Sequence, residues 1–207
     1  MKKQIIFLLF LASGLLFAQS AKSLEAVCSS LASHPNTIGD FTQIKTIQTN
    51  GRKLKSSGKY IISTQGILWQ TEKPLATSLI LTKDAMVQIA ANGNKAAMSG
   101  KDNQIFGQIS ETLSSVFSGD VAALKKNFEC DFTSGSDGSW KVLLTPKDST
   151  IASVMKTLEL SGITKPETAM TTLVMSEASG NSITYEFINQ KYPEELSADE
   201  KKIFILE

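Results

Sequence analysis

The chain has 207 residues, of which 42% are hydrophobic, and its 21 Lys and Arg residues nearly balance its 20 Asp and Glu residues. A formal net charge of +1 gives no electrostatic footprint for nucleic acid or for an anionic membrane surface. A chain of this length is most simply one domain with a sizeable core.

The N-terminus has the three parts of an export signal. A basic pair precedes an apolar run from Ile5 to Phe17, and small residues follow, with a cleavage site predicted after Ser20. The apolar run is shorter than the roughly 20 residues that a membrane-spanning helix needs. We therefore expect residues 1–20 to be a signal peptide and residues 21–207 to form an exported domain without a membrane anchor.

The first part of this domain predicts one helix and then a meander of strands. Apolar residues at helical spacing predict a short amphipathic helix in residues 21–34. Alternation in residues 40–49 predicts a strand that enters a hairpin at an Asn-Gly turn. Turn chemistry separates the strand-length segments that follow, which is typical of antiparallel pairing. These segments are residues 58–64, 66–71, 77–82 and 85–91.

The period of the apolar residues changes in the middle of the chain. Residues 102–119 and 120–128 predict two helices, the second with Asp120 as its N-cap. Residues 148–156 predict a short helical turn, and the tail, residues 192–207, reads as polar and extended. Further strands are predicted in residues 130–135, 139–147, 157–162, 168–180 and 181–190.

Nine or ten strands with few helices indicate an α+β fold, in which a large antiparallel sheet is covered on one side. A sheet of this size must close, split into two layers or curl around something. The helices at the start and in the middle of the chain are then candidates for covering the mouth of the curl.

Catalytic chemistry has little material in this sequence. His34 is the only histidine, which leaves almost nothing for a Ser-His-Asp triad or a histidine-based metal site. No nucleophile-elbow, zincin, phosphate-loop or dinucleotide motif occurs, and the acidic residues are dispersed over turns and helix ends. We expect no enzymatic activity, no metal and no cofactor.

The two cysteines leave two alternatives open. After export, Cys28 and Cys130 would lie in an oxidising compartment, where they could form a disulfide. They could equally remain two separate buried thiols, because the sequence does not show whether their Cα atoms come within about 7 Å.

Three segments, taken in order, resemble the LolA family of outer-membrane lipoprotein carriers. Residues 40–88 have Phe-x-Gln in the first strand, Ser-Gly in the second, a Trp in the third and a Pro at the following turn. The segment "VLLTPKDSTIASVMKTLELSG" contains that family's Leu-x-Pro-Lys pattern, and "ASGNSITYEFINQ" resembles its glycine-led strand ending in Phe and Asn. The chain is similar to a divergent member of this family over nearly all of the exported domain.

This resemblance implies a fold and a function. The fold is an incomplete, unclosed antiparallel β-barrel with helices forming a lid over an apolar concave face. The implied function is that of a monomeric periplasmic carrier without a nucleic-acid partner. It binds the acyl chains of lipoproteins at an inner-membrane transporter and passes them to an outer-membrane acceptor. The alternatives are a related carrier of another lipid cargo, or a non-catalytic binding or sensor module of the same fold.

The candidate lipid-binding residues are apolar positions on the sheet and on the lid. A tryptophan in a strand belongs more often to the core than to a ligand wall, although in a hollow sheet the two roles merge. Ile67 and Trp69 share one face of their strand by alternation. The candidates are Leu31, Phe41, Ile67, Trp69, Ile105, Ile109, Leu113 and Phe117.

One departure from the family concerns the lid. Members of the family have an arginine at the end of the strand before the tryptophan strand, where it contacts the lid. This chain has Ser63, Thr64 or Gln65 at that place, so the gating contact that the resemblance implies is missing.

Overall fold

The structure is a computed structural model that describes residues 23–82, 85–97 and 104–205, with the side chains of residues 104–110 left out. The expected signal peptide, residues 1–20, lies outside the described residues.

The strands of the described chain form one antiparallel sheet. They are β1 (Asn36–Thr46), β2 (Lys53–Ser63), β3 (Gly66–Lys73), β4 (Thr77–Leu81), β5 (Met86–Ile89), β6 (Lys95–Ala97), β7 (Phe128–Ser134), β8 (Ser139–Pro146), β9 (Met155–Ile163), β10 (Ala169–Glu177) and β11 (Ser182–Lys191). Their order is β6-β5-β4-β3-β2-β1-β11-β10-β9-β8-β7. The pairing of β1 with β11 joins two meanders. Since β6 and β7 lie at opposite ends of this order, the predicted unclosed antiparallel barrel is confirmed.

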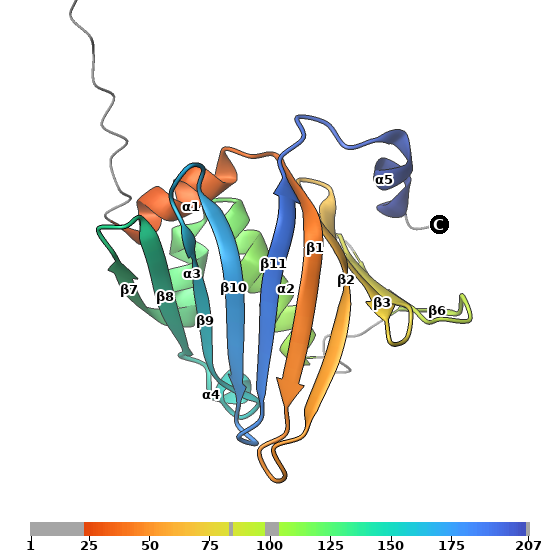
Figure 1. Cartoon of the computed structure of the whole chain (residues 1–207), viewed down its shortest axis with the longest axis horizontal. Coiled ribbons are helices and arrows are strands. Elements are labelled where there is room, and N and C mark those ends of the chain that lie inside the picture. The colour runs from red at the N-terminus through yellow and green to blue at the C-terminus, as the bar shows by residue number, and fades with distance from the viewer. Residues whose placement is uncertain (1–22, 83–84, 98–103, 206–207) are drawn as a thin grey trace, which may run out of the picture.

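The described helices lie on two sides of the sheet. They are α1 (Leu24–Ala32), α2 (Gln104–Phe117), α3 (Val121–Asn127), α4 (Ser149–Ala152) and α5 (Ala198–Ile203). The sheet curls around α1, α2 and α3, which lie behind it in Figure 1, whereas α5 lies apart from them at the upper right. We call the face that packs against α1–α3 the concave face.

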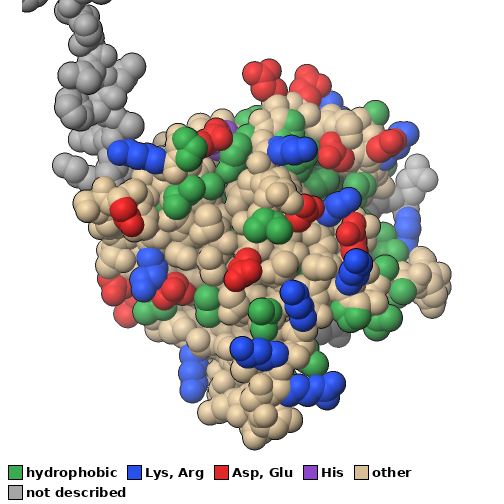
Figure 2. Space-filling view, viewed as in Figure 1, with side chains coloured by type: hydrophobic (Ala, Val, Ile, Leu, Met, Phe, Trp, Pro, Cys, Tyr) green, Lys and Arg blue, Asp and Glu red, His purple; other side chains and the backbone are tan. Residues whose placement is uncertain are grey.

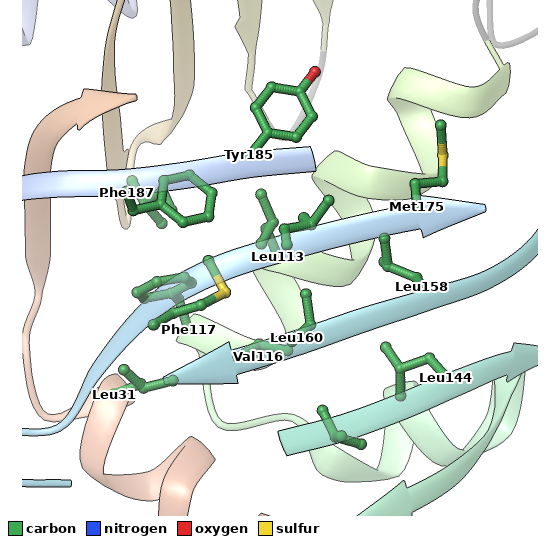
Figure 3. Packing of buried hydrophobic residues seen from close by; sticks show 14 of the residues in the cluster. Leu31, Leu113, Val116, Phe117, Leu144, Leu158, Leu160, Met175, Tyr185 and Phe187 are labelled. Carbon is green, nitrogen blue, oxygen red and sulfur yellow. The ribbon is translucent and has the colours of Figure 1, made fainter. Parts of the chain in front are cut away.

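The main core lies between α2 and the concave face. Leu113, Val116 and Phe117 point from α2 toward apolar side chains of the strands, among them Leu158 and Met175 (Figure 3). Burial of this many aliphatic side chains is the main stabilising contribution to the fold, at about 25 cal/mol per Å² of apolar surface. The helices therefore pack on the sheet as the predicted α+β arrangement requires.

A second, smaller cluster lies on the convex face. Ile61, Leu68 and Ile80 point away from the main core because they alternate along β2, β3 and β4 with residues of the concave face. The side chains of Ile203 and Phe204, at the end of α5, pack against this cluster. The C-terminal helix thus covers a part of the sheet that would otherwise expose large apolar side chains.

The C-terminal tail differs from the extended chain that the sequence pattern predicts. It folds into α5, whose N-terminus is a capping box: Ser197 Oγ accepts from the Glu200 backbone N–H, and the Glu200 carboxylate accepts from the Ser197 backbone N–H. Capping boxes satisfy two otherwise unpaired donors at a helix start. The strands also extend further than predicted, with β1 beginning at Asn36 and β2 at Lys53.

The rest of the convex face carries charges of both signs. Figure 2 shows Lys and Arg interspersed with Asp and Glu over the upper and middle parts of this face, and only Lys and Arg toward its lower end. Within the described ranges, no helix combines the length and the apolar composition that crossing a bilayer demands.

Candidate functional site

A cavity of about 570 Å³ lies between the lid helices and one end of the sheet. Small-molecule sites typically have volumes of roughly 300–1,000 Å³. The ends of α1 and α2 form one side of the cavity, and β2, β3 and β4 form the other. The lining residues are Ala32, His34, Pro35, Ile62, Ser63, Thr64, Gln65, Gly66, Ile67, Leu81, Thr82, Ser114, Phe117 and Ser118.

The cavity lining is amphipathic. Its apolar part comes from both the sheet and the lid, with Ile67 and Leu81 on the strands and Phe117 on α2. Hydroxyl, amide and imidazole side chains supply the remainder. Such a lining suits a ligand with a hydrocarbon part and a polar end. The polar side chains are His34, Ser63, Thr64, Gln65, Thr82, Ser114 and Ser118.

The β2–β3 turn forms the sheet side of the cavity mouth. Ser63 pairs with Gly66 across the turn, and Ser63 Oγ donates to the Gly66 carbonyl at 3.2 Å and accepts from the Gln65 backbone N–H at 3.2 Å. Gly66 has a φ of 147°, and a Cβ there would lie 2.1 Å from the Leu81 carbonyl oxygen. Only glycine combines this backbone angle with so close an approach of β4.

His34, just after α1, forms part of the lid side of the mouth. Its Nε2 lies 3.3 Å from Oε1 of Glu167, and its ring stacks on Tyr192 with centroids 4.1 Å apart and an interplanar angle of 22°. The histidine that the sequence analysis assigned to a helix end thus lines the cavity and contacts the C-terminal segment.

The centre of the concave face is filled by aromatic side chains. The Trp69 ring lies 5.0 Å from that of Phe41 and 4.9 Å from that of Tyr185, centroid to centroid. Tyr60 and Phe187 complete the group. Burial raises the pKa of the Tyr185 hydroxyl well above its ordinary value, which reflects how little water reaches this region. The hollow therefore lies beside the aromatic group, at the β2–β4 end of the sheet.

The predicted lipid-binding residues fall into three groups. Ile67 and Phe117 line the cavity. The side chains of Ile105 and Ile109, on α2, lie outside the described part of the molecule. The remaining four are buried in the main core and do not line the cavity; they are Leu31, Phe41, Trp69 and Leu113.

Sequence reasoning missed several lining residues. Ile62 and Leu81 face the cavity from the ends of β2 and β4, and their alternation with Ile61 and Ile80 could have placed them on the concave face. The three residues at the place of the family's arginine, Ser63–Gln65, all line the mouth. The position that departs from the family therefore lies at this cavity.

The two cysteines are free thiols, so the disulfide considered from the sequence is not formed in this structure. Cys28 lies at 0% exposure on the inner side of α1, and burial raises the pKa of its thiol to about 12. Cys130 is half-buried on β7. Over the part of the chain that the structure describes, no group of three or more His, Cys, Asp or Glu residues could hold a metal ion.

Comparison with known families gives one match over most of the chain. The family model for the outer membrane lipoprotein carrier protein LolA matches residues 35–203. No curated protein sequence matches closely enough to be counted as a relative.

Solved structures with the same fold are distant in sequence. A LolA superfamily protein from Nitrosomonas europaea has a TM-score of 0.50 at 10% identity, covering 90% of this chain and 99% of its own. A DUF1329 family protein from Desulfovibrio piger has a TM-score of 0.51 at 12% identity, covering 84% of this chain and 92% of its own. At these identities the likeness shows the fold alone.

Proposed function

Because this chain belongs to the family of the outer membrane lipoprotein carrier protein LolA, we propose that it is a periplasmic carrier of acylated cargo. The cargo's acyl chains enter the cavity between the lid and β2–β4. In the family's role, lipoproteins are taken from an inner-membrane transporter and delivered to an outer-membrane acceptor. A related lipid is the alternative cargo.

The observation that carries this proposal is the partly apolar cavity between the lid helices and β2–β4. Each buried methylene contributes about 0.8 kcal/mol, so an acyl chain of about sixteen carbons does not cross water unshielded at useful rates. Ile67, Leu81 and Phe117 offer such a chain an apolar wall from both sides. The polar side chains at the mouth can face the polar end of the cargo or the solvent.

The aromatic group beside the cavity bears on the alternative of a sensor or binding module. That alternative expects a concave face filled by its own side chains, and the centre of the sheet is filled in this way. The cavity is the feature that favours a carrier. A larger cargo would need α2 to move away from the sheet, and the contacts of Leu113, Val116 and Phe117 with the strands are apolar, so they impose no hydrogen-bond geometry on that movement.

The first experiment looks for cargo directly. The exported chain is purified without detergent, extracted into organic solvent and analysed by mass spectrometry, and binding of a fluorescent fatty acyl probe is titrated. The proposal expects acylated molecules in the extract and saturable binding of the probe. A chain that yields no acylated molecule and binds no probe is not a carrier of this kind.

A blocking variant then tests the location of the site. Ser114 is an exposed residue of α2 that lines the cavity, so Ser114→Trp fills the space without removing a core side chain. The matched control is Ala122→Trp on the exposed side of α3. We expect probe affinity to fall at least about tenfold for Ser114→Trp, equal to about 1.4 kcal/mol, and to stay unchanged for the control. Equal affinities would place the site elsewhere.

A further inference from the structure

The C-terminal segment contacts both sides of the cavity mouth. Residues 192–204, which we call the C-terminal strap, leave the end of β11 and finish just after α5. Tyr192 is the first residue of the strap and Phe204 the last. These two rings lie against the two parts of the molecule that face each other across the mouth.

The first contact is on the lid side. Tyr192 stacks on His34 with ring centroids 4.1 Å apart, and His34 follows α1 and lines the cavity. Stacked rings at this separation attract each other beyond the burial of their surface. The strap therefore holds His34, which lies just beyond the end of the first lid helix.

The second contact is on the sheet side. A ring carbon of Phe204, Cδ1, lies 3.2 Å from the position that a Cβ of Gly66 would occupy. Gly66 belongs to the β2–β3 turn, which lines the cavity, whereas Phe204 packs against the cluster on the convex face. The turn thus lies between the cavity and the Phe204 ring. Any outward movement of the turn requires Phe204 to move with it, because packed side chains leave little free space.

The strap is itself anchored between these two contacts. The Asn36 side-chain amide donates to the Pro193 carbonyl at 3.1 Å and to the Glu194 carbonyl at 3.0 Å. Asn36 and Leu196 are buried. Beyond Leu196, the capping box starts α5, and Ile203 packs in the cluster on the convex face. The strap is therefore fixed to the sheet and cannot follow either side of the mouth freely.

We propose that the C-terminal strap is a clamp that sets the width of the cavity mouth, with Tyr192 and Phe204 as its positioning residues. This inference rests on the proposed function in so far as the mouth is where cargo enters and leaves. The clamp acts from outside the cavity, since neither ring lines it. This chain has Ser63–Gln65 at the place of the family's lid-contacting arginine, and the clamp restrains the mouth instead.

A clamp of this kind changes rates more than affinity. Loosening it widens the mouth in the free and in the loaded protein alike, while the cavity walls keep their residues. Probe association and dissociation should both become faster, and the dissociation constant should change little. If α5 has only a structural role, loosening it would instead lower the free energy of unfolding of the whole molecule. The rates at which the folded protein binds and releases the probe would then stay unchanged.

The test uses the whole exported chain and the variants Phe204→Ala and Tyr192→Ala. Phe204→Leu is the conservative variant, and Ile205→Ala is the matched control because Ile205 is 65% exposed. Backbone amide hydrogen exchange is followed in residues 63–67, and association and dissociation of a fluorescent fatty acyl probe are followed by stopped flow. Thermal midpoints are recorded for each variant.

For Phe204→Ala we expect about tenfold faster amide hydrogen exchange in residues 63–67, because loss of a packing contact allows local opening. The association and dissociation rates of the probe should both rise at least about threefold. Phe204→Leu should restore most of the difference, and Ile205→Ala should match the parent chain. If the hydrogen-exchange rates and the probe rates of Phe204→Ala equal those of Ile205→Ala, the clamp proposal is wrong. If the parent chain binds no probe, the proposed function fails, and hydrogen exchange still decides whether the strap restrains the turn.

Discussion

The Trp69 ring meets the Tyr185 ring edge to face, with centroids 4.9 Å apart and an interplanar angle of 89°. The two side chains come from β3 and β11, which are separated in the sheet by β2 and β1. Neighbouring strands lie about 4.8 Å apart, so rings from strands three places apart can touch only because the sheet curls strongly. The contact therefore shows that the sheet is strongly curved, and this curvature leaves room for the cavity at one end of the sheet.

Replacing Trp69 tests whether this contact belongs to the core. Trp69 is 4% exposed, and Trp69→Ala removes the centre of the aromatic group. We expect a loss of about 3–5 kcal/mol in the free energy of unfolding, measured by urea denaturation. Leu75→Ala, at a position 71% exposed, should change it by less than about 0.5 kcal/mol. A stable Trp69→Ala variant that has lost probe binding would instead make this ring part of the ligand wall.

Much of the fold could be predicted because its signals are local. Alternation along one strand places Ile67 and Trp69 on the same face, and helical spacing places Leu113 and Phe117 on one side of a helix. The position of the cavity could not be predicted, because it depends on how tightly the sheet curls and on which side chains meet across it. Sequence alone therefore does not separate Ile67, at the cavity, from Trp69 in the core.

The C-terminal segment shows a different reason for a miss. Ser197 and Glu200 have the spacing of a capping box, a signal that sequence reasoning can use, yet α5 spans only Ala198–Ile203. So short a helix is not stable by itself. It forms because Ile203 and Phe204 pack against the convex face, and that partner surface is not adjacent in sequence.

The β2–β3 turn depends on glycine at one position. Gly66→Ala brings a Cβ to 2.1 Å from the Leu81 carbonyl oxygen at a φ of 147°, so both the turn and β4 must shift. We expect a loss of about 2–4 kcal/mol in unfolding free energy and altered probe exchange, measured by urea denaturation and stopped flow. Gly51→Ala is the matched control, because Gly51 also has a positive φ but has nothing within 4 Å of its Cβ position. It should lose only about 1–2 kcal/mol. Equal losses would mean that the approach of β4 is unimportant.

A buried carboxylate joins the β10–β11 hairpin to β1. Glu177 Oε1 lies 2.7 Å from Lys45 Nζ, and its Oε2 accepts from Ser179 Oγ and from the Asn181 side-chain amide at 2.9 Å each. Burial raises the pKa of this carboxyl, but the hydrogen bonds from Lys45, Asn181 and Ser179 outweigh it. The folded-state pKa lies below the ordinary value of 4.5.

This shift gives a stability that depends on pH. Because the folded pKa of Glu177 is the lower one, its ionised form stabilises the fold above about pH 4.5, and that contribution is lost as the pH falls through the folded pKa. Glu177→Gln should be less stable than the parent by about 2 kcal/mol at pH 7, and the gap should narrow progressively as the pH falls below the ordinary pKa of 4.5. Glu159→Gln, which removes a more exposed pair with Lys141, should show no such gap. Parallel pH profiles for Glu177→Gln and the parent would refute the assignment.

The two free thiols should differ in reactivity. Cys28 is fully buried and the pKa of its thiol is raised to about 12, so it stays protonated and shielded near neutral pH. Burial also raises the pKa of the Cys130 thiol, but this side chain is only half-buried and reagent can reach it. Since the thiolate is the reactive form, alkylation of the folded chain should label Cys130 slowly, and faster at pH 9 than at pH 7. When the chain is alkylated again after unfolding without reductant, its intact mass should show both cysteines labelled. Cys130→Ser should take up no label while folded.

A parent chain that takes up no label even when unfolded would contain a disulfide between Cys28 and Cys130, contrary to this structure.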